Sequence, residues 1–375
     1  MVVKLVQLND FQRQWEDIRD DALAAIKAVG RSGSYILGRE VATFEESLAT
    51  AWGSQYAIGV GSGLDALEIS LRVLGCGPGD KVLTTPLSAF ASTLAILKLG
   101  AVPVFVDTDE FGLIDLDACR SVLRTRPDVR FLAPVHLYGH SVDLGQLGTL
   151  RDEYGCEVVE DCAQSIGASH NSIPTGTVGR MAATSFYPTK NLGALGDGGA
   201  ILTGDPDLAC TVRALRDYGQ SAKYRHELVG YNSRLDELQA ALLRRVFLPR
   251  LAAGLERRRL IARRYTRGIR NPALRVMGAP RGSDSCWHLF PVLVEGGRKT
   301  DFMNWLGSQG VGCGEHYPCA IPDQPAMKGV AFESAGPLEI ARRICRSQVS
   351  LPVHPYLTDS DLGRVIEACN AWRGF

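Results

Sequence analysis

The feature that most constrains the fold is an alternation of short apolar runs with amphipathic stretches between about residues 56 and 204. Runs typical of β-strands occur at 56–60, 81–85, 101–107, 131–135 and 156–161, and helical patterns at 64–74 and 88–99 lie between some of them. Strands separated by helical segments predict βαβ units and a parallel sheet covered by helices on both faces. Ligands bind at the carboxyl ends of the strands in such sheets, so we expect functional residues just after these runs.

The pattern changes near residue 230. A capping box from Ser233 to Asp236 is expected to open a long Leu- and Arg-rich helical stretch that runs to about Tyr265. A strand-like run at 289–295 and helices near 300–309 and 359–373 follow it. We therefore predict two domains, a large one over residues 1–250 and a smaller C-terminal α/β domain over residues 251–375.

Charge and composition exclude several classes of partner. The 41 basic side chains balance 41 acidic ones and form no basic block, which argues against nucleic acid as the main partner. No apolar stretch approaches the roughly 18 residues of a membrane span, and the first residues lack the apolar core of a signal peptide. The ten cysteines include no C-x-x-C pair, and His136 and His140 fall at a strand end and turn, so no metal site is expected. We expect a cytoplasmic protein that contacts neither nucleic acid nor membrane.

The segment GSGLDA at 61–66 joins a strand to a helix and matches the dinucleotide pattern G-x-G-x-x-A. That pattern also needs an acidic residue at the end of the next strand, but Asp80 precedes that strand, which ends in Thr84 and Thr85. A nicotinamide-dependent oxidoreductase is therefore disfavoured but stays open. The same helix N-terminus would suit one phosphate monoester, with a tight packing turn as an equal alternative.

Two further residues stand at strand ends. Asp161 closes the run at 156–161, where a lone Asp is more often the N-cap of a helix. Lys190 follows a Pro turn and precedes the glycine-rich segment NLGALGDGG, and it is one of only 8 lysines among the 41 basic residues. Most lysines are solvated. A lysine between apolar and glycine residues can instead be desolvated, which lowers its pKa and makes its amine nucleophilic.

One cofactor accounts for all three features. Pyridoxal phosphate (PLP) needs a lysine for its aldehyde, a carboxylate for its ring nitrogen and a helix N-terminus for its phosphate. The chain offers the phosphate loop, the acid and the lysine in that order, each at the end of a strand. We therefore predict a PLP enzyme.

These segments resemble the sugar aminotransferases of the DegT/DnrJ/EryC1/StrS family, which are fold type I PLP enzymes. The resemblance is carried by SGSYILGRE (32–40), GSGLDAL, EDCAQSIGA (160–168), SFYPTKNLGALGDGGA (185–200), GYNSRLDELQ (230–239), HYP (316–318) and LPVHPYLTD (351–359). It covers nearly the whole chain. It implies an α/β fold: a large domain with a mostly parallel sheet covered by helices, and a smaller C-terminal α/β domain.

The resemblance also implies a role for each site residue. Lys190 would form the Schiff base and then move protons. The cofactor residues would be Asp161 at the ring nitrogen, Gln164 at the ring hydroxyl, Phe90 on the ring face, the backbone of Gly63 and Leu64 with the Ser185 hydroxyl at the phosphate, and Asn232 at the phosphate of the neighbouring subunit. A homodimer with shared active sites follows from the last of these. Phe90 could also be an ordinary core residue, and Leu64 stands where many members have Thr.

The implied reaction is transamination of a nucleotide-linked keto-deoxysugar, first of all a TDP-3-keto-6-deoxyhexose, with L-glutamate as the amino donor. Such a step belongs to deoxyaminosugar biosynthesis, for an antibiotic or a surface polysaccharide. A 4-keto nucleotide sugar or another keto sugar or cyclitol is the alternative substrate, and a non-catalytic PLP- or sugar-binding protein is an alternative of another class. Candidate substrate residues, taken from their place in family-like loops, are His316, Tyr317, His288 and Tyr35.

Overall fold

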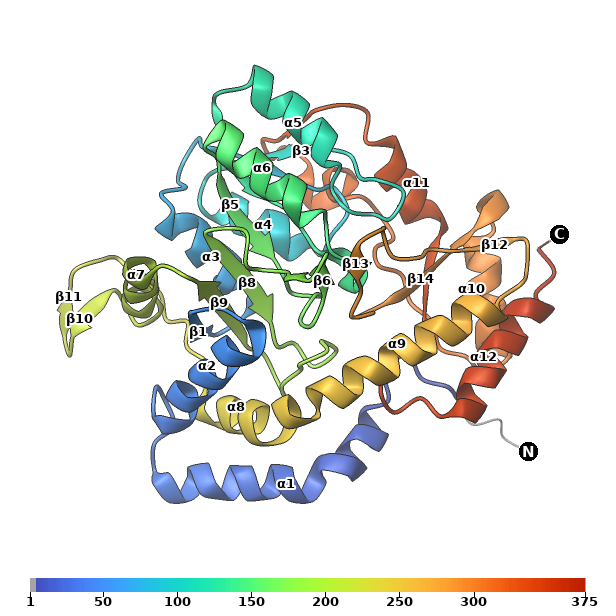
Figure 1. The fold of residues 1–375 in the computed structure, drawn as a ribbon, viewed down its shortest axis with the longest axis horizontal. Coiled ribbons are helices and arrows are strands. Elements are labelled where there is room, and N and C mark those ends of the chain that lie inside the picture. The colour runs from blue at the N-terminus through green and yellow to red at the C-terminus, as the bar shows by residue number, and fades with distance from the viewer. Residues whose placement is uncertain (1–4, 375) are drawn as a thin grey trace.

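The alternating segment folds into an eight-stranded sheet of order β1-β9-β8-β5-β4-β2-β3-β15 in the computed structural model, which describes residues 5–374 (Figure 1). The strands are β1 (Tyr56–Val60), β2 (Lys81–Thr84), β3 (Val102–Phe105), β4 (Val129–Ala133), β5 (Glu157–Asp161), β8 (Met181–Ser185), β9 (Gly199–Thr203) and β15 (Glu333–Ser334). The six strands from β8 to β15 pair in parallel, whereas β9 is antiparallel to both of its neighbours. The predicted mostly parallel sheet is confirmed.

Helices cover both faces of this sheet, as predicted. They are α1 (Phe11–Ser32), α2 (Arg39–Trp52), α3 (Gly63–Val73), α4 (Phe90–Lys98), α5 (Leu116–Thr125), α6 (Leu144–Tyr154) and α7 (Pro206–Arg216). Successive residues of one strand enter different cores: Leu132 of β4 packs with α5 and α6, whereas Phe131 and Ala133 pack with α3 and α7. This alternation follows from the two-residue period of a strand and explains why these strands are apolar throughout.

The chain after the large sheet forms a second, smaller layer. It contains α9 (Leu251–Gly268), α10 (Lys299–Ser308), α11 (Glu339–Ser347) and α12 (Asp359–Ala371). The preceding α8 (Glu237–Leu242) and a π-helical turn (Leu243–Phe247) pack against α1 and α2 in the core of the larger layer. Its sheet is antiparallel, with β14 (Phe290–Val294) between β12 (Leu274–Val276) and β16 (Gln348–Leu351). The domain boundary near residue 250 stays a prediction. From beyond it, β15 returns to the edge of the large sheet, beside β3.

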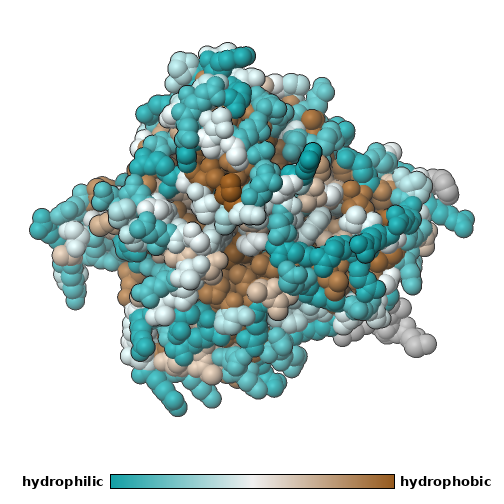
Figure 2. Space-filling model, viewed as in Figure 1, coloured by the Kyte–Doolittle hydropathy of each residue, from teal (hydrophilic) through white to brown (hydrophobic). Residues whose placement is uncertain are grey.

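Two small sheets complete the fold. The hairpin of β10 (Gln220–Ala222) and β11 (Arg225–His226) projects from the body of the molecule beside α7 (Figure 1). A three-stranded sheet joins β6 (Ser169–His170), β7 (Ile173–Pro174) and β13 (Ser283–Asp284). In Figure 2, hydrophobic residues gather in a hollow between the carboxyl end of β8 and the helices α8 and α9.

The predicted capping box from Ser233 to Asp236 is wrong. The helix begins at Glu237 with Asp236 as its N-cap, and the cap makes no side-chain hydrogen bond. The Ser233 hydroxyl instead accepts a hydrogen bond from the Gly61 N–H (3.0 Å) and donates to Asp65 Oδ2 (2.7 Å). A residue that resembles a helix cap in the sequence therefore holds the loop at the start of α3 in the folded chain.

Candidate active site

Lys190 lies in the loop that follows β8. The loop is held tightly: the Lys190 N–H donates to the Tyr187 carbonyl (2.8 Å) and the Ala194 N–H to that of Phe186 (2.8 Å). Gly193 is needed there because a Cβ would lie 2.4 Å from the Pro188 carbonyl oxygen. Burial lowers the pKa of Lys190 to about 8, although the charge of Asp161 acts in the opposite direction. A larger share of the amine is therefore neutral and nucleophilic near neutral pH than in an exposed lysine.

Asp161 ends β5 and is 4% exposed. Its Oδ2 accepts a hydrogen bond from the Ser92 hydroxyl (2.7 Å), which lies 2.8 Å from the Ser88 hydroxyl, and its Oδ1 accepts from the Ala163 N–H (3.0 Å). No helix follows within residues 162–168, so Asp161 is not a helix cap. Sequence analysis missed both serines. The available signal was two hydroxyls four residues apart, just after a strand.

The N-terminus of α3 lies against the end of β8. A Cβ on Gly63 would come within 2.6 Å of Ser185 Cβ, so only glycine permits this approach. The Ser62 hydroxyl caps the helix by accepting a hydrogen bond from the Asp65 N–H (3.1 Å), and the Ser62 carbonyl accepts one from the Ala66 N–H (3.0 Å). Within residues 5–374, this leaves the N–H groups of Gly63 and Leu64 without an acceptor beside the Ser185 hydroxyl. Such unpaired first-turn donors form an anion site.

Gln164 is held at both ends of its side-chain amide. Its Oε1 accepts from the Tyr138 N–H (2.7 Å), and its Nε2 donates to the Tyr317 hydroxyl (3.3 Å). The Tyr138 hydroxyl in turn donates to the His316 carbonyl (2.7 Å). Burial raises the pKa of Tyr317, so its phenol stays protonated at neutral pH. These contacts link the loop after β5 to the segment 316–317 of the smaller layer.

Two histidines lie near enough to Lys190 for its charge to affect them. Burial, reinforced by that charge, lowers the pKa of His316 to about 4 and that of His288 well below its ordinary value. Both rings are therefore neutral at physiological pH. His288 Nδ1 lies 3.4 Å from Asn191 Oδ1, which ties it to the residue after Lys190. The structure thus places His288 and His316 near Lys190, and Tyr317 near Asp161 and Gln164. Their role in a substrate pocket stays a prediction.

For the other three predicted site residues, Tyr35, Phe90 and Asn232, the structure shows no hydrogen bond to Lys190 or Asp161 within residues 5–374. Tyr35 is 54% exposed in the loop before α2, and none of its hydrogen bonds within residues 5–374 involves Lys190 or Asp161. Phe90 is half-buried at the start of α4 and packs on the apolar cluster around Phe105, so its contact with a cofactor ring stays a prediction. Asn232 is exposed beside Ser233, and its role at a neighbouring subunit also stays a prediction.

A buried cluster next to Asp161 resembles a metal site. His136, Glu160 and Cys162 present ligand atoms within 4.8 Å of one another. Glu160, however, already accepts hydrogen bonds from His136 Nε2 (2.8 Å) and from the N–H groups of Gly176 (2.7 Å), Val178 (2.8 Å) and Gly179 (2.7 Å). Burial raises the Glu160 pKa, but these donors outweigh it and hold the pKa below its ordinary value. The cluster therefore anchors the end of β5 and so positions Asp161.

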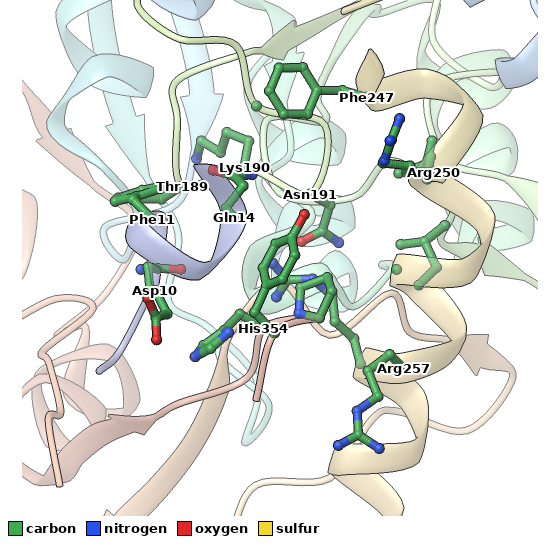
Figure 3. A pocket seen from close by; sticks show the side chains of 18 of the residues that line it. Asp10, Phe11, Gln14, Thr189, Lys190, Asn191, Phe247, Arg250, Arg257 and His354 are labelled. Carbon is green, nitrogen blue, oxygen red and sulfur yellow. The ribbon is translucent and has the colours of Figure 1, made fainter. Parts of the chain in front are cut away.

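A cavity of about 410 Å³ opens on one side of Lys190, between the N-termini of α1 and α9 and residues 354–356 (Figure 3). Lys190, Asn191 and His354 are among its lining residues, but Asp161, Gln164 and Ser185 are not. Lys190 thus belongs both to the wall of this cavity and to the group of residues around Asp161.

The residues present fit the predicted PLP. The unpaired N–H groups of Gly63 and Leu64 beside Ser185 suit a phosphate. The buried Asp161, oriented by two donors, suits a protonated ring nitrogen, and the amine of Lys190 suits an aldehyde. When bound, PLP would act as an electron sink that stabilises a carbanion at the carbon bearing the transferred amine.

Comparisons with known proteins agree with the family and the cofactor expected from the sequence. Residues 16–370 match the DegT/DnrJ/EryC1/StrS aminotransferase family. The dTDP-3-amino-3,4,6-trideoxy-alpha-D-glucose transaminase of Streptomyces venezuelae is 41% identical over 368 residues, which are 98% of this chain and 96% of that protein. The crystal structure of S. venezuelae DesV superposes with a TM-score of 0.93 at 40% identity and 99% coverage of both chains. That of NtdA from Bacillus subtilis with the bound cofactor PMP has a TM-score of 0.85 at 29% identity and covers 94% of this chain and 81% of that chain.

Proposed function

The chain belongs to the DegT/DnrJ/EryC1/StrS aminotransferase family, and we propose that it transfers the amino group of L-glutamate to the 3-keto carbon of a dTDP-linked deoxysugar. Membership makes it a PLP-dependent sugar aminotransferase of fold type I, so the resemblance found in the motifs is confirmed. The nicotinamide interpretation of GSGLDA is not retained, because the chain matches an aminotransferase family over residues 16–370.

The observation that carries the proposal is that Lys190, Asp161 and the α3 N-terminus follow the carboxyl ends of β8, β5 and β1 in one sheet. Lys190 would bond to the cofactor aldehyde and, once released, would carry a proton between the donor's α-carbon and the cofactor. Asp161 would keep the ring nitrogen protonated, and the hydrogen bond from Ser92 would orient the Asp161 carboxylate. The neutral His288 and His316 offer hydrogen bonds to sugar hydroxyls without adding charge beside the lysine.

The 3-keto position is proposed from the Streptomyces venezuelae relative, which is a dTDP-3-amino-3,4,6-trideoxy-alpha-D-glucose transaminase. A 4-keto sugar or a cyclitol remains the alternative acceptor. We place the reaction in deoxyaminosugar biosynthesis, for an antibiotic or a surface polysaccharide, and in the cytoplasm. Within residues 5–374, no helix has the length and apolar character needed to cross a membrane.

We also propose a homodimer with shared active sites. Large apolar side chains are exposed on and beside the projecting hairpin, notably Tyr224 (82%) and Val229 (83%). Asn232 follows this segment and is exposed, so it is free to reach a second subunit. Co-expressed Lys190→Ala and Asn232→Ala chains test this, because a mixed dimer would contain one site with both residues intact. Activity in the mixture, without activity in either homodimer, is the expected result.

A panel assay tests the reaction. Purified protein is incubated with glutamate and dTDP-linked 3-keto and 4-keto deoxysugars, and the product is identified by mass spectrometry and NMR. The proposal expects a 3-amino sugar. Glutamate alone should shift the absorbance of the loaded protein, whereas a non-catalytic binder would show no shift. A 4-amino product would overturn the 3-keto assignment.

A further inference from the structure

The cavity beside Lys190 contains one buried cation with unused hydrogen-bond donors. Arg258 of α9 is 5% exposed and lines the cavity. Its Nη1 donates to the carbonyl oxygens of Trp287 (3.2 Å), His288 (3.2 Å) and Val353. Its Nε and Nη2 donate to no atom of residues 5–374, and no carboxylate of that part of the chain forms an ion pair with it. One edge of the guanidinium is therefore unused.

Apart from Lys190 itself, the other ionic groups that line this cavity are already paired. The pairs are Arg250 with Asp17 and Asp21, Arg257 with Asp359, and Asp10 with Arg13. Burial lowers the pKa of Arg258 to about 10, so it still carries its charge at neutral pH. A buried charge without a counter-ion is costly, and an anion in the cavity would compensate it.

A second buried polar atom in the cavity wall also lacks a partner. His354 is 4% exposed, and its Nε2 lies 3.2 Å from the Gln7 carbonyl, which accepts a hydrogen bond and so assigns the ring proton to Nε2. Nδ1 is then an acceptor, and it is left without a donor. Burial, reinforced by the charge of Arg258, lowers the pKa of His354 to about 4, so this ring is neutral. Besides Lys190, the residues that line the cavity thus include one cation without a counter-ion, Arg258, and one buried neutral histidine whose Nδ1 has no partner.

We propose that this cavity binds the carboxylate of the α-amino acid that donates the amino group, and that the free edge of Arg258 is its partner. The inference rests on the proposed function and assigns a residue to its donor half-reaction. A guanidinium edge with two N–H donors matches the two oxygens of a carboxylate. Lys190 lines the same cavity, so the amino end of the molecule would lie toward the lysine.

The size of the cavity favours a small anion over the nucleotide. Ligand pockets range from about 300 to 1,000 Å³, and about 410 Å³ lies near the lower limit. An amino acid fits this range better than a nucleotide-linked sugar does. A diphosphate would offer the same chemistry to Arg258, so the experiment has to separate the two ligands.

Three variants separate binding from structural support. Arg258→Gln removes the charge, and Arg258→Lys restores it without the planar edge. Arg259→Gln is the matched control, because Arg259 lies next on α9 and also holds backbone carbonyls, those of Ser285 (3.3 Å) and Gly167 (2.9 Å), but does not line the cavity. Calorimetry of the PLP-loaded proteins measures the affinity for glutarate, a non-reacting analogue of the donor, and for dTDP. Stopped-flow absorbance gives the KM for glutamate alone.

Arg258→Gln should raise the glutarate Kd and the glutamate KM about 10-fold to 100-fold, the usual effect of losing a hydrogen bond to a charged group. Its dTDP affinity should stay within about twofold, Arg258→Lys should recover part of the loss, and Arg259→Gln should resemble the wild type. An unchanged glutarate Kd would overturn the assignment. So would a loss confined to dTDP, or an equal loss of both ligands in Arg258→Gln and Arg259→Gln. Glutarate binding through Arg258 in a protein that aminates no keto sugar would instead refute the proposed function and leave this site intact.

Discussion

Gly63→Ala tests the phosphate site most directly. The new Cβ would lie 2.6 Å from Ser185 Cβ and 3.2 Å from Ser185 Cα and Oγ. Non-bonded carbon atoms prefer roughly 3.5–4.0 Å, so the first turn of α3 has to move about 1 Å away from β8. A hydrogen bond of about 2.9 Å that lengthens by that amount is lost. Losing one charge-assisted bond to the phosphate costs about 1.5–3 kcal/mol.

The expected result is a PLP dissociation constant raised about 10-fold to 100-fold, measured by titrating the apoprotein and following absorbance. Overpacking also costs about 1–3 kcal/mol of stability, so urea unfolding of the apoprotein is measured in parallel. Gly30→Ala is the matched control, because Gly30 lies in α1 and a Cβ there would meet no atom within 4 Å. It should leave PLP affinity unchanged and make α1 slightly more stable.

The reasoning fails if folded Gly63→Ala binds PLP within twofold of the wild type. That result would mean that the phosphate does not lie on the N–H groups of Gly63 and Leu64. A loss of affinity that merely follows a loss of fold, with the apoprotein already unfolded at the assay temperature, is recognised from the urea curve. In that case Ser185→Ala is tested in place of Gly63→Ala. It removes only a hydroxyl group and should still weaken PLP binding.

Three further predictions concern the lysine and the two carboxylates. Because the pKa of Lys190 is about 8 in the folded apoprotein and 10.5 for an ordinary lysine, the unfolded chain binds more protons in this window. From pH 8 to pH 10.5, the free energy of unfolding of the wild type, measured in urea, should therefore rise by about 2–3 kcal/mol more than that of Lys190→Met. The same pH dependence in both proteins would contradict this prediction. Glu160→Gln should cost about 3–5 kcal/mol of stability, whereas the exposed Glu46→Gln should change it by less than about 0.5 kcal/mol in the same assay. Ser92→Ala removes the hydroxyl that donates to Asp161 and should lower kcat/KM about 10-fold or more in a coupled glutamate assay, with partial recovery in Ser92→Thr; full activity in Ser92→Ala would show that Asp161 needs no such support.

Much of the site was predictable from local sequence because its signals are short. The strand ending at Asp161, the glycines around Lys190 and the Gly63 turn each occupy about ten residues, and each places one group at the carboxyl edge of a parallel sheet. The strand positions were also predictable, since residues buried on both faces give continuous apolar runs. The parts that could not be predicted depend on partners distant in the chain.

Ser233 and Arg258 are two residues whose roles could not be predicted from local sequence. Ser233 resembled a helix cap, but its hydroxyl is bonded to Asp65, 168 residues away in sequence. Arg258 lies among consecutive arginines in a chain with 33 of them, and only its burial and its missing carboxylate partner distinguish it from Arg257 and Arg259. The sequence by itself determined the positions of five strands of the large sheet, the cofactor and the lysine, because periodicity and turn chemistry act within one element. The tertiary structure alone decided which hydroxyls orient Asp161 and which arginine keeps a free edge, because hydrogen-bond partners and burial are set by elements that meet only when the chain is folded.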